Sequence, residues 1–370
     1  MPKLKHALLL VHGAGRYGKF EVDSKGNKTW KPDTKGWFAS ATKTLEAVFD
    51  IAKAPAGKTE AFGDLFEVVE ISYDRIFEQF RQDWISQAKQ WEVLGPELKF
   101  LGLDQKTIQS VRKFLKSGEE DNFGWNNVLD VVLYMAPTVR AQVNAEVMKQ
   151  VGAVGSALGK KYSKWSFIAH SLGTAVIHDA YPSWVGGRSV PPQGPQIVCS
   201  LSNLSRLLNG KTSGPHNKVM QPGQDPNPQS YIEGRHDLDF IAQILPFEPG
   251  WDSSIYSLYS RCVGLNDLYP GDTLNDWPKT VLDALSLPHE FSHYMYQPEV
   301  AARLWSNLLG KTTRRAEIRA AVEKSAPGKI EDALRNSLKA EVEKALKNLP
   351  AADKIVESKI IQALTDFFGG

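Results

Sequence analysis

A serine in the middle of the chain has neighbours that suit nucleophilic chemistry. The residues before it, from Trp165 to Ala169, are mostly apolar and predict a buried strand, and those from Thr174 onward predict a buried helix. Ser171 then occupies the strand-to-helix turn, where small residues at Ala169 and Gly173 relieve crowding and the helix N-terminus supplies positive potential. The sequence A-H-S-L-G is therefore close to a nucleophile elbow, G-x-S-x-G, with alanine at the first glycine. A serine that merely caps an ordinary helix would have the same local sequence.

A glycine-rich loop, H-G-A-G at residues 12–15, follows the first apolar run at residues 6–11. Together with the glycine at position 18 it also satisfies the dinucleotide-binding pattern G-x-G-x-x-G. That interpretation needs an acidic residue at a strand end about 20 residues further on, and the sequence has none there. We therefore treat the match as chance and expect no cofactor.

The elements that must position these residues alternate between strand and helix. Continuous apolar runs predict strands at residues 6–11, 65–71, 165–169 and 196–204 and near 231–240, and apolar residues at helical spacing predict helices at 37–51, at 139–158 and from about 298. Such alternation predicts an α/β fold with a mostly parallel sheet and helices on both faces. Ligands bind at the carboxyl ends of the strands in these sheets, and H-G-A-G, H-S-L-G and H-D-L-D all fall at such ends.

The chain is longer than these elements require. Residues 75–135 carry more large apolar side chains than a crossover needs and predict a helical cap-like insertion, and residues 311–370 predict an amphipathic C-terminal helical extension. The core is then expected to comprise residues 1–74 and 136–310. We expect the cap to roof the serine with an apolar pocket, which would favour esters of short or medium acyl length.

Composition excludes several classes of protein. Lys and Arg total 44 against 42 Asp and Glu, and a net charge of +2 does not steer the protein to nucleic acid or acidic membranes. Cys199 and Cys262 lie far apart in no metal-ligand pattern, so we expect free thiols and no metal site. The first apolar run is too short for a signal peptide, and no run approaches the roughly 20 residues that span a bilayer. We expect a cytoplasmic protein.

Four stretches together resemble the α/β-hydrolases, especially the bacterial lipases and esterases. They are LLLVHGAG at 8–15, FIAHSLGTAVIHDA at 167–180, HDLDFIAQILPF at 236–247 and HEFSHYMYQPEV at 289–300, and the resemblance covers about residues 4–310. It implies an α/β-hydrolase fold and a catalytic triad in the chain order serine, acid, histidine. The insertion and the tail are not part of the family pattern.

The resemblance assigns each member of the triad. Ser171 is the nucleophile, and Asp239 aligns with the aspartate that follows the seventh strand in many of these enzymes. Asp237 is the alternative acid, because a slip in the loop reverses which carboxylate faces the site. The base is expected in the loop before the helix that starts near residue 298, where we prefer His293, at the head of an aromatic run, to His289.

The same resemblance implies an oxyanion hole of two backbone amides. The elbow supplies the amide of Leu172, and the loop after the first strand supplies that of Ala14. Gly13 and Gly15 allow that loop to come close to the substrate, and we expect the imidazole of His12 to brace it.

These assignments predict a serine hydrolase, esterase- or lipase-like, that cleaves carboxylic esters through an acyl-enzyme on Ser171. The expected partner is a small-molecule or lipid ester. A thioesterase or an amidase would use the same residues. The alternative from a different class is a non-catalytic hydrolase-fold module that binds lipid or protein, because a fold does not fix a function. We favour the enzyme, since such a module has no chemical need to keep serine, acid, base and glycine loop together.

Overall fold

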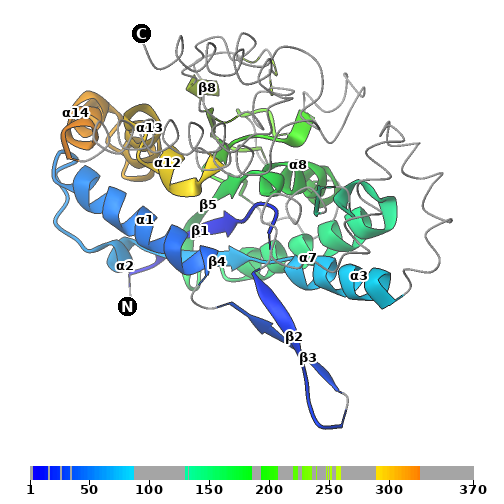
Figure 1. Cartoon of the computed structure of the whole chain (residues 1–370). Coiled ribbons are helices and arrows are strands. Elements are labelled where there is room, and N and C mark those ends of the chain that lie inside the picture. Colours follow the sequence, from blue (N-terminus) through cyan, green and yellow to red (C-terminus); the bar gives the residue numbers. More distant parts are fainter. Residues whose placement is uncertain are drawn as a thin grey trace, which may run out of the picture.

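The computed structural model contains a six-stranded sheet with helices on both faces (Figure 1). It describes residues 3–86 except 16, 26, 34 and 35; 130–185 except 132; 193–206; 220–235 except 224–226; 239, 247, 249, 251, 256–259; and 289–325. The sheet order is β4-β1-β5-β6-β7-β8, and all five neighbouring pairs are parallel. The strands are β1 (Lys5–Val11), β4 (Phe66–Ile71), β5 (Tyr162–His170), β6 (Ile197–Leu201), β7 (Ser230–Gly234) and β8 (Tyr256–Tyr259).

The helices form two layers. On one face lie α1 (Trp37–Lys53), α12 (Phe291–Met295), α13 (Pro298–Leu308) and α14 (Arg315–Ser325), and on the other α3 (Asp74–Ser86), α7 (Pro137–Ser156) and α8 (Leu172–Val185) (Figure 1). Side chains of β1 alternate between the layers, because successive residues of a strand point to opposite faces. Leu8 and Leu10 pack in the first layer, and Ala7, Leu9 and Val11 in the second. The short helices α2 (Phe62–Leu65) and η6 (Thr312–Arg314) complete the described elements. The predicted α/β class is confirmed.

The strand order places a switch point at the centre of the sheet. From β1 the chain moves outward to β4 and then crosses back to β5, after which β6, β7 and β8 follow on the other side. Val11 pairs with Ala169 where β1 and β5 lie side by side. The H-G-A-G loop and the serine turn therefore leave the sheet next to each other, at the position where parallel sheets of this kind bind ligands.

The helix predicted at 139–158 is confirmed as α7.

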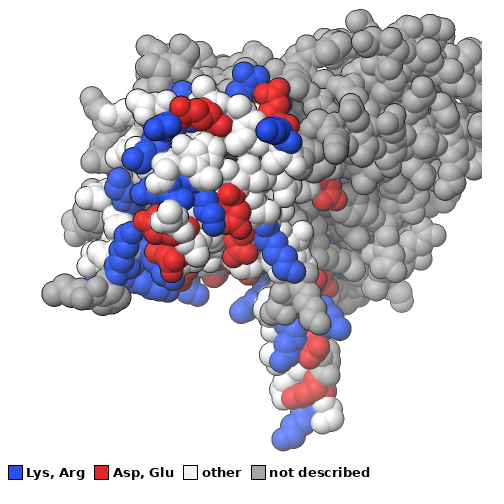
Figure 2. Space-filling model, turned by 90° about the vertical axis from the view of Figure 1, so that its left-hand side faces the viewer, with Lys and Arg blue, Asp and Glu red and all other residues white. Residues whose placement is uncertain are grey.

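A β-hairpin in the lysine-rich stretch before α1 was not predicted from the sequence. Strands β2 (Gly18–Val22) and β3 (Lys28–Pro32) pair antiparallel, with Phe20 opposite Trp30. The hairpin projects from the body (Figure 1). Residues 18–22 alternate between apolar and polar, but each strand has only five residues, and so short a run within a lysine-rich stretch is a weak strand signal. On the face shown in Figure 2, basic side chains are interspersed with acidic ones, both here and over the body.

Parts of the predicted insertion and tail are described. Helix α3 begins the insertion, the segment from Asp130 ends it, and residues 87–129 lie outside the described residues. Arg81 of α3 forms a buried ion pair with Asp130, which joins the two ends of the undescribed segment. At the other end of the chain, α14 packs on α1 and α13, and Ile318 and Val322 belong to their hydrophobic cluster. The amphipathic helix predicted beyond residue 325 lies outside the described residues.

Two compositional predictions can be compared with the structure. Cys199 is buried and free, as expected, and Cys262 is outside the described residues. Among the helices that the structure describes, none combines the length and the apolar character needed to cross a bilayer.

Candidate active site

Ser171 sits in a strained turn between β5 and α8. Its φ of 54° lies in the left-handed region, which residues other than glycine rarely adopt. The turn is held on both sides: the Ser171 amide donates to the Leu201 carbonyl of β6 (2.9 Å), and the Thr174 hydroxyl donates to the Ser171 carbonyl (2.6 Å). A Cβ at Gly173 would lie 2.4 Å from the His12 carbonyl oxygen. The predicted close approach of helix and strand at this glycine is therefore confirmed.

A chain of hydrogen bonds joins Ser171, His289 and Asp239. The Ser171 Oγ is 2.7 Å from His289 Nε2, and His289 Nδ1 is 2.8 Å from Asp239 Oδ2. The three residues come from the β5–α8 turn, from the chain just before α12 and from the chain after β7. This is the connectivity of a nucleophile, a base and the acid that orients the base.

The structure reverses the preference for His293. His289, the alternative, contacts Ser171, whereas His293 is in the last turn of α12, one helical turn further along the chain. His289 reaches the serine because it precedes the helix and its backbone is anchored: the Nε2–H of His170 donates to the His289 carbonyl (2.6 Å). Asp239 is the preferred acid that the structure brings to the histidine, and Asp237 lies outside the described residues.

The Asp239 carboxylate accepts hydrogen bonds that sequence reasoning missed. The Tyr294 hydroxyl donates to Oδ2 (2.5 Å), and the Ser202 hydroxyl bonds the same carboxylate and lies 3.0 Å from His289 Nδ1. Burial alone would raise the pKa of Asp239, but His289, Tyr294 and Ser202 outweigh it and lower the pKa below its ordinary value. The acid is therefore ionised at neutral pH and can hold the imidazole. Ser202 is itself strained, with a φ of 52° at the end of β6.

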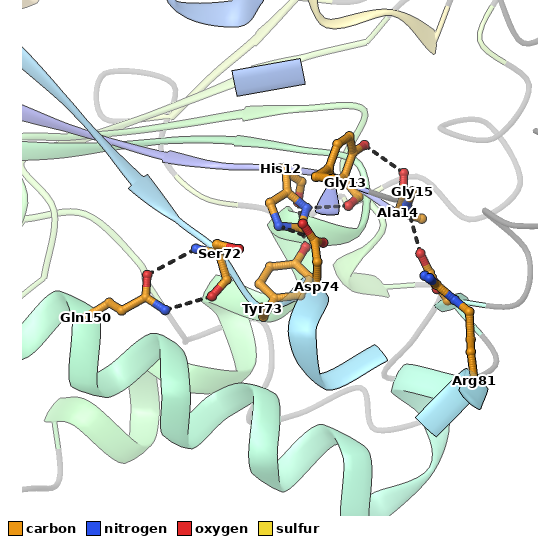
Figure 3. Close-up of polar contacts among 11 residues, drawn as sticks. His12, Gly13, Ala14, Gly15, Ser72, Tyr73, Asp74, Arg81 and Gln150 are labelled. Carbon is orange, nitrogen blue, oxygen red and sulfur yellow. Dashed lines mark hydrogen bonds and ion pairs between the residues drawn. The ribbon is translucent and has the colours of Figure 1, made fainter. Parts of the chain in front are cut away.

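The H-G-A-G turn presents its amides and has its carbonyls bound (Figure 3). The Tyr73 hydroxyl donates to the His12 carbonyl (2.5 Å), His12 Nδ1 donates to the Gly13 carbonyl (2.7 Å), and the Tyr17 hydroxyl donates to the Ala14 carbonyl (2.9 Å). Within the described residues, the amides of Gly13 and Ala14 donate no hydrogen bond. His12 thus braces the loop, as predicted, and the amides remain available to a ligand.

This turn lies directly against the serine. A Cβ at Gly13 would be 2.7 Å from the Ser171 Cβ. The second predicted donor, the amide of Leu172, is in the first turn of α8, where backbone N–H groups have no intrahelical acceptor. Two segments that supply amides therefore border the serine hydroxyl.

Gly15 ends the turn and ties it to the insertion. Its φ of +147° suits glycine, and its amide donates to Asp130 Oδ2 (2.8 Å), the same carboxylate that pairs with Arg81 (Figure 3). Sequence reasoning missed Asp130 and Tyr73 because each bonds a backbone group far away in sequence. It also missed Tyr17, which bonds the carbonyl of Ala14 three residues before it in an irregular turn.

No family model, curated protein or solved structure matches the chain. Among the residues that the structure describes, no group of three or more His, Cys, Asp or Glu side chains is arranged to hold a metal ion.

Proposed function

We propose that this protein is a serine hydrolase with an α/β-hydrolase fold that cleaves carboxylic esters, in the manner of an esterase or lipase. The observation that carries the proposal is the hydrogen-bonded chain from Ser171 through His289 to Asp239. A serine in a strained turn, a base within 2.7 Å and an ionised acid behind it meet the requirements for an activated hydroxyl.

The reaction would proceed through an acyl-enzyme. His289 Nε2 takes the proton of Ser171 as Oγ attacks the ester carbonyl carbon, while Asp239 stabilises the imidazolium. The amides of Leu172 and Ala14 bind the oxyanion of the tetrahedral intermediate. His289 then gives its proton to the departing alcohol, and the same steps with water as nucleophile release the acid and restore the serine.

The open amides of the turn support an enzyme over a binding module of the same fold. Three carbonyls in a row have side-chain donors, whereas the two amides beside the serine have no acceptor among the described residues. A buried amide without an acceptor costs free energy. Two backbone N–H groups without an acceptor in the resting protein are suited to stabilising a negative charge that develops only during a reaction.

The proposal predicts that a fluorophosphonate probe labels Ser171. Mass spectrometry of the intact folded protein is expected to show one adduct, localised to the peptide that contains residue 171, and the Ser171→Ala variant is expected to show none. A panel of p-nitrophenyl esters from acetyl to palmitoyl then reports acyl preference. Folded wild-type protein that acquires no adduct on Ser171 would contradict the proposal.

A second prediction concerns the contact between the turn and the serine. In Gly13→Ala the new methyl would lie 2.7 Å from the Ser171 Cβ, so the turn must shift and the Ala14 amide with it. We expect kcat for p-nitrophenyl acetate to fall by about 10² to 10³, the range for loss of one oxyanion donor.

The matched control is Gly152→Ala, in the interior of α7, where nothing lies within 4 Å of the new methyl. We expect full activity and a gain of about 0.5–1 kcal/mol in the free energy of unfolding, because alanine is the better helix former. Gly13→Ala with wild-type kcat would show that this turn does not bind the oxyanion.

A further inference from the structure

A second histidine–aspartate pair lies behind the oxyanion turn. His12 Nε2 is 3.1 Å from Asp74 Oδ1, and the two side chains are 1% and 2% exposed (Figure 3). The separation is that of an ion pair, and within the described residues neither His12 Nε2 nor either Asp74 oxygen has a hydrogen-bond partner. Asp74 is the first residue of α3. The proposed catalytic steps use neither side chain.

The donors and acceptors fix how many protons the pair holds. His12 Nδ1 must carry a proton, because it contacts the Gly13 carbonyl, which can only accept. Nε2 then has either a second proton that faces a carboxylate or a lone pair that faces a protonated carboxyl group. In both cases one proton lies between Nε2 and Oδ1. Without it, two electron-rich atoms would meet 3.1 Å apart in a buried site, which is strongly unfavourable.

The planarity of the peptide bond links this pair to the oxyanion. The Gly13 carbonyl and the Ala14 amide belong to one peptide unit, and in a trans peptide the C=O and N–H bonds point in opposite directions. The bond from His12 Nδ1 to the Gly13 carbonyl therefore directs the Ala14 N–H away from the imidazole. The Tyr73 hydroxyl acts in the same way on the preceding peptide unit, through the His12 carbonyl.

We propose that His12 and Asp74 are positioning residues that share one proton and thereby hold the Ala14 amide in place as an oxyanion donor. The inference rests on the proposed hydrolase function. If the shared proton is lost, the remaining imidazole proton moves to Nε2 to face the carboxylate, Nδ1 becomes an acceptor, and the Gly13 carbonyl faces a lone pair. The peptide unit then loses the contact that orients it, and activity falls on the alkaline side.

The surroundings favour retention of the proton at neutral pH. Burial, followed by the charge of Asp130, raises the pKa of Asp74 well above its ordinary value, and burial lowers the pKa of His12 to about 4. The titratable and charged groups around the pair are Tyr17, Glu70, Tyr73, Arg81, Asp130 and His170. Burial raises the pKa of both tyrosines well above 10 and lowers that of His170 to about 3. The tyrosines and His170 therefore remain uncharged between pH 7 and 10.

The test compares two replacements of Asp74. In Asp74→Asn the side-chain amide can donate to Nε2 but has no proton to lose, so we expect kcat at pH 7 within about threefold of wild type and no alkaline decline from this pair. In Asp74→Ala nothing faces Nε2, and we expect kcat to fall about 10- to 100-fold with little change in KM, because the contact matters most in the transition state. ¹⁵N NMR of His12 is expected to show a neutral ring protonated at Nδ1.

The possible failures are distinguishable. If wild-type protein neither hydrolyses esters nor reacts with the fluorophosphonate, the proposed function fails. If wild type is active and Asp74→Asn keeps the wild-type alkaline profile, or the NMR spectrum places the neutral proton on Nε2, the inference about the pair is wrong. Should Asp74→Ala not fold, the Asp74→Asn pH profile and the NMR spectrum still decide. Thermal melting of Asp74→Asn confirms that it is folded.

Discussion

Replacement of His289 by alanine is expected to lower kcat for ester hydrolysis by about 10⁶-fold, the loss seen when a serine protease loses its base. His289 is the only histidine in the described part of the chain within hydrogen-bond reach of Ser171 Oγ, at 2.7 Å. Without it, Ser171 keeps its proton and is a weak nucleophile at neutral pH. Steady-state and single-turnover hydrolysis of p-nitrophenyl acetate measures the effect.

His293→Ala is the matched control, because this histidine belongs to the same short segment and was the preferred base on sequence grounds. It is in the last turn of α12, so its loss is expected to leave kcat close to that of wild type. Circular dichroism and melting temperatures establish that both variants are folded. A His293→Ala variant as inactive as His289→Ala would invalidate the assignment of the base.

The second large effect is a loss of stability in mild acid. Burial lowers the pKa of His6 to about 3, and burial followed by His289 lowers that of His170 to about 3. Between pH 6.5 and 4.5 these two side chains are neutral in the folded protein and protonated in the unfolded chain, so unfolding takes up two protons. For each proton taken up, the free energy of unfolding falls by about 1.4 kcal/mol for every unit by which the pH decreases. The two histidines together lower it by about 3 kcal/mol per unit.

The pair of His12 and Asp74 does not add to this acid slope. Between pH 6.5 and 4.5 the unfolded chain has a protonated histidine, with two ring protons, and an ionised aspartate. The folded pair also holds two protons, one on His12 Nδ1 and one shared with Asp74. Unfolding therefore neither takes up nor releases a proton at this pair. Above pH 6.5 the unfolded chain loses that proton before the folded one does, and stability declines as pH rises through the raised pKa of Asp74. The free energy of unfolding is therefore expected to be greatest near pH 6.5.

Urea unfolding at pH 7, 6 and 5 measures the acid slope. Since His6 accounts for one of the two protons, His6→Gln is expected to halve the dependence on pH. Glu70, whose pKa is raised by burial, offsets part of the slope near the acid end. A urea midpoint that is the same at pH 7 and pH 5 would contradict the prediction.

The parts of the site that depend on local pattern could be predicted from sequence. The position of Ser171 in a strand-to-helix turn could be predicted because an apolar strand, several small residues and the start of a helix follow one another within about a dozen positions. The H-G-A-G turn was found for the same reason, and Asp239 through the resemblance. The preference for His293 over His289 was wrong, since the two histidines are four positions apart and the choice depends on where α12 begins.

The network around the site could not be predicted. Tyr73 bonds a carbonyl 61 residues away, and Tyr294 bonds a carboxylate 55 residues away. Such contacts depend on the order of strands in the sheet, and periodicity does not reveal the order. The hairpin of β2 and β3 was missed for a different reason, because strands of five residues in a lysine-rich stretch give only a weak alternating pattern.

The ion pair between Arg81 and Asp130 has a consequence for how this chain can vary. Because the two side chains touch, chain positions on either side of the undescribed segment are held close together. The entropy of closing a loop grows only slowly with its length, so short and long segments can be exchanged here at similar thermodynamic cost. We therefore expect this junction to be a point of modularity, at which the length of the intervening segment can change with little effect on the six-stranded sheet.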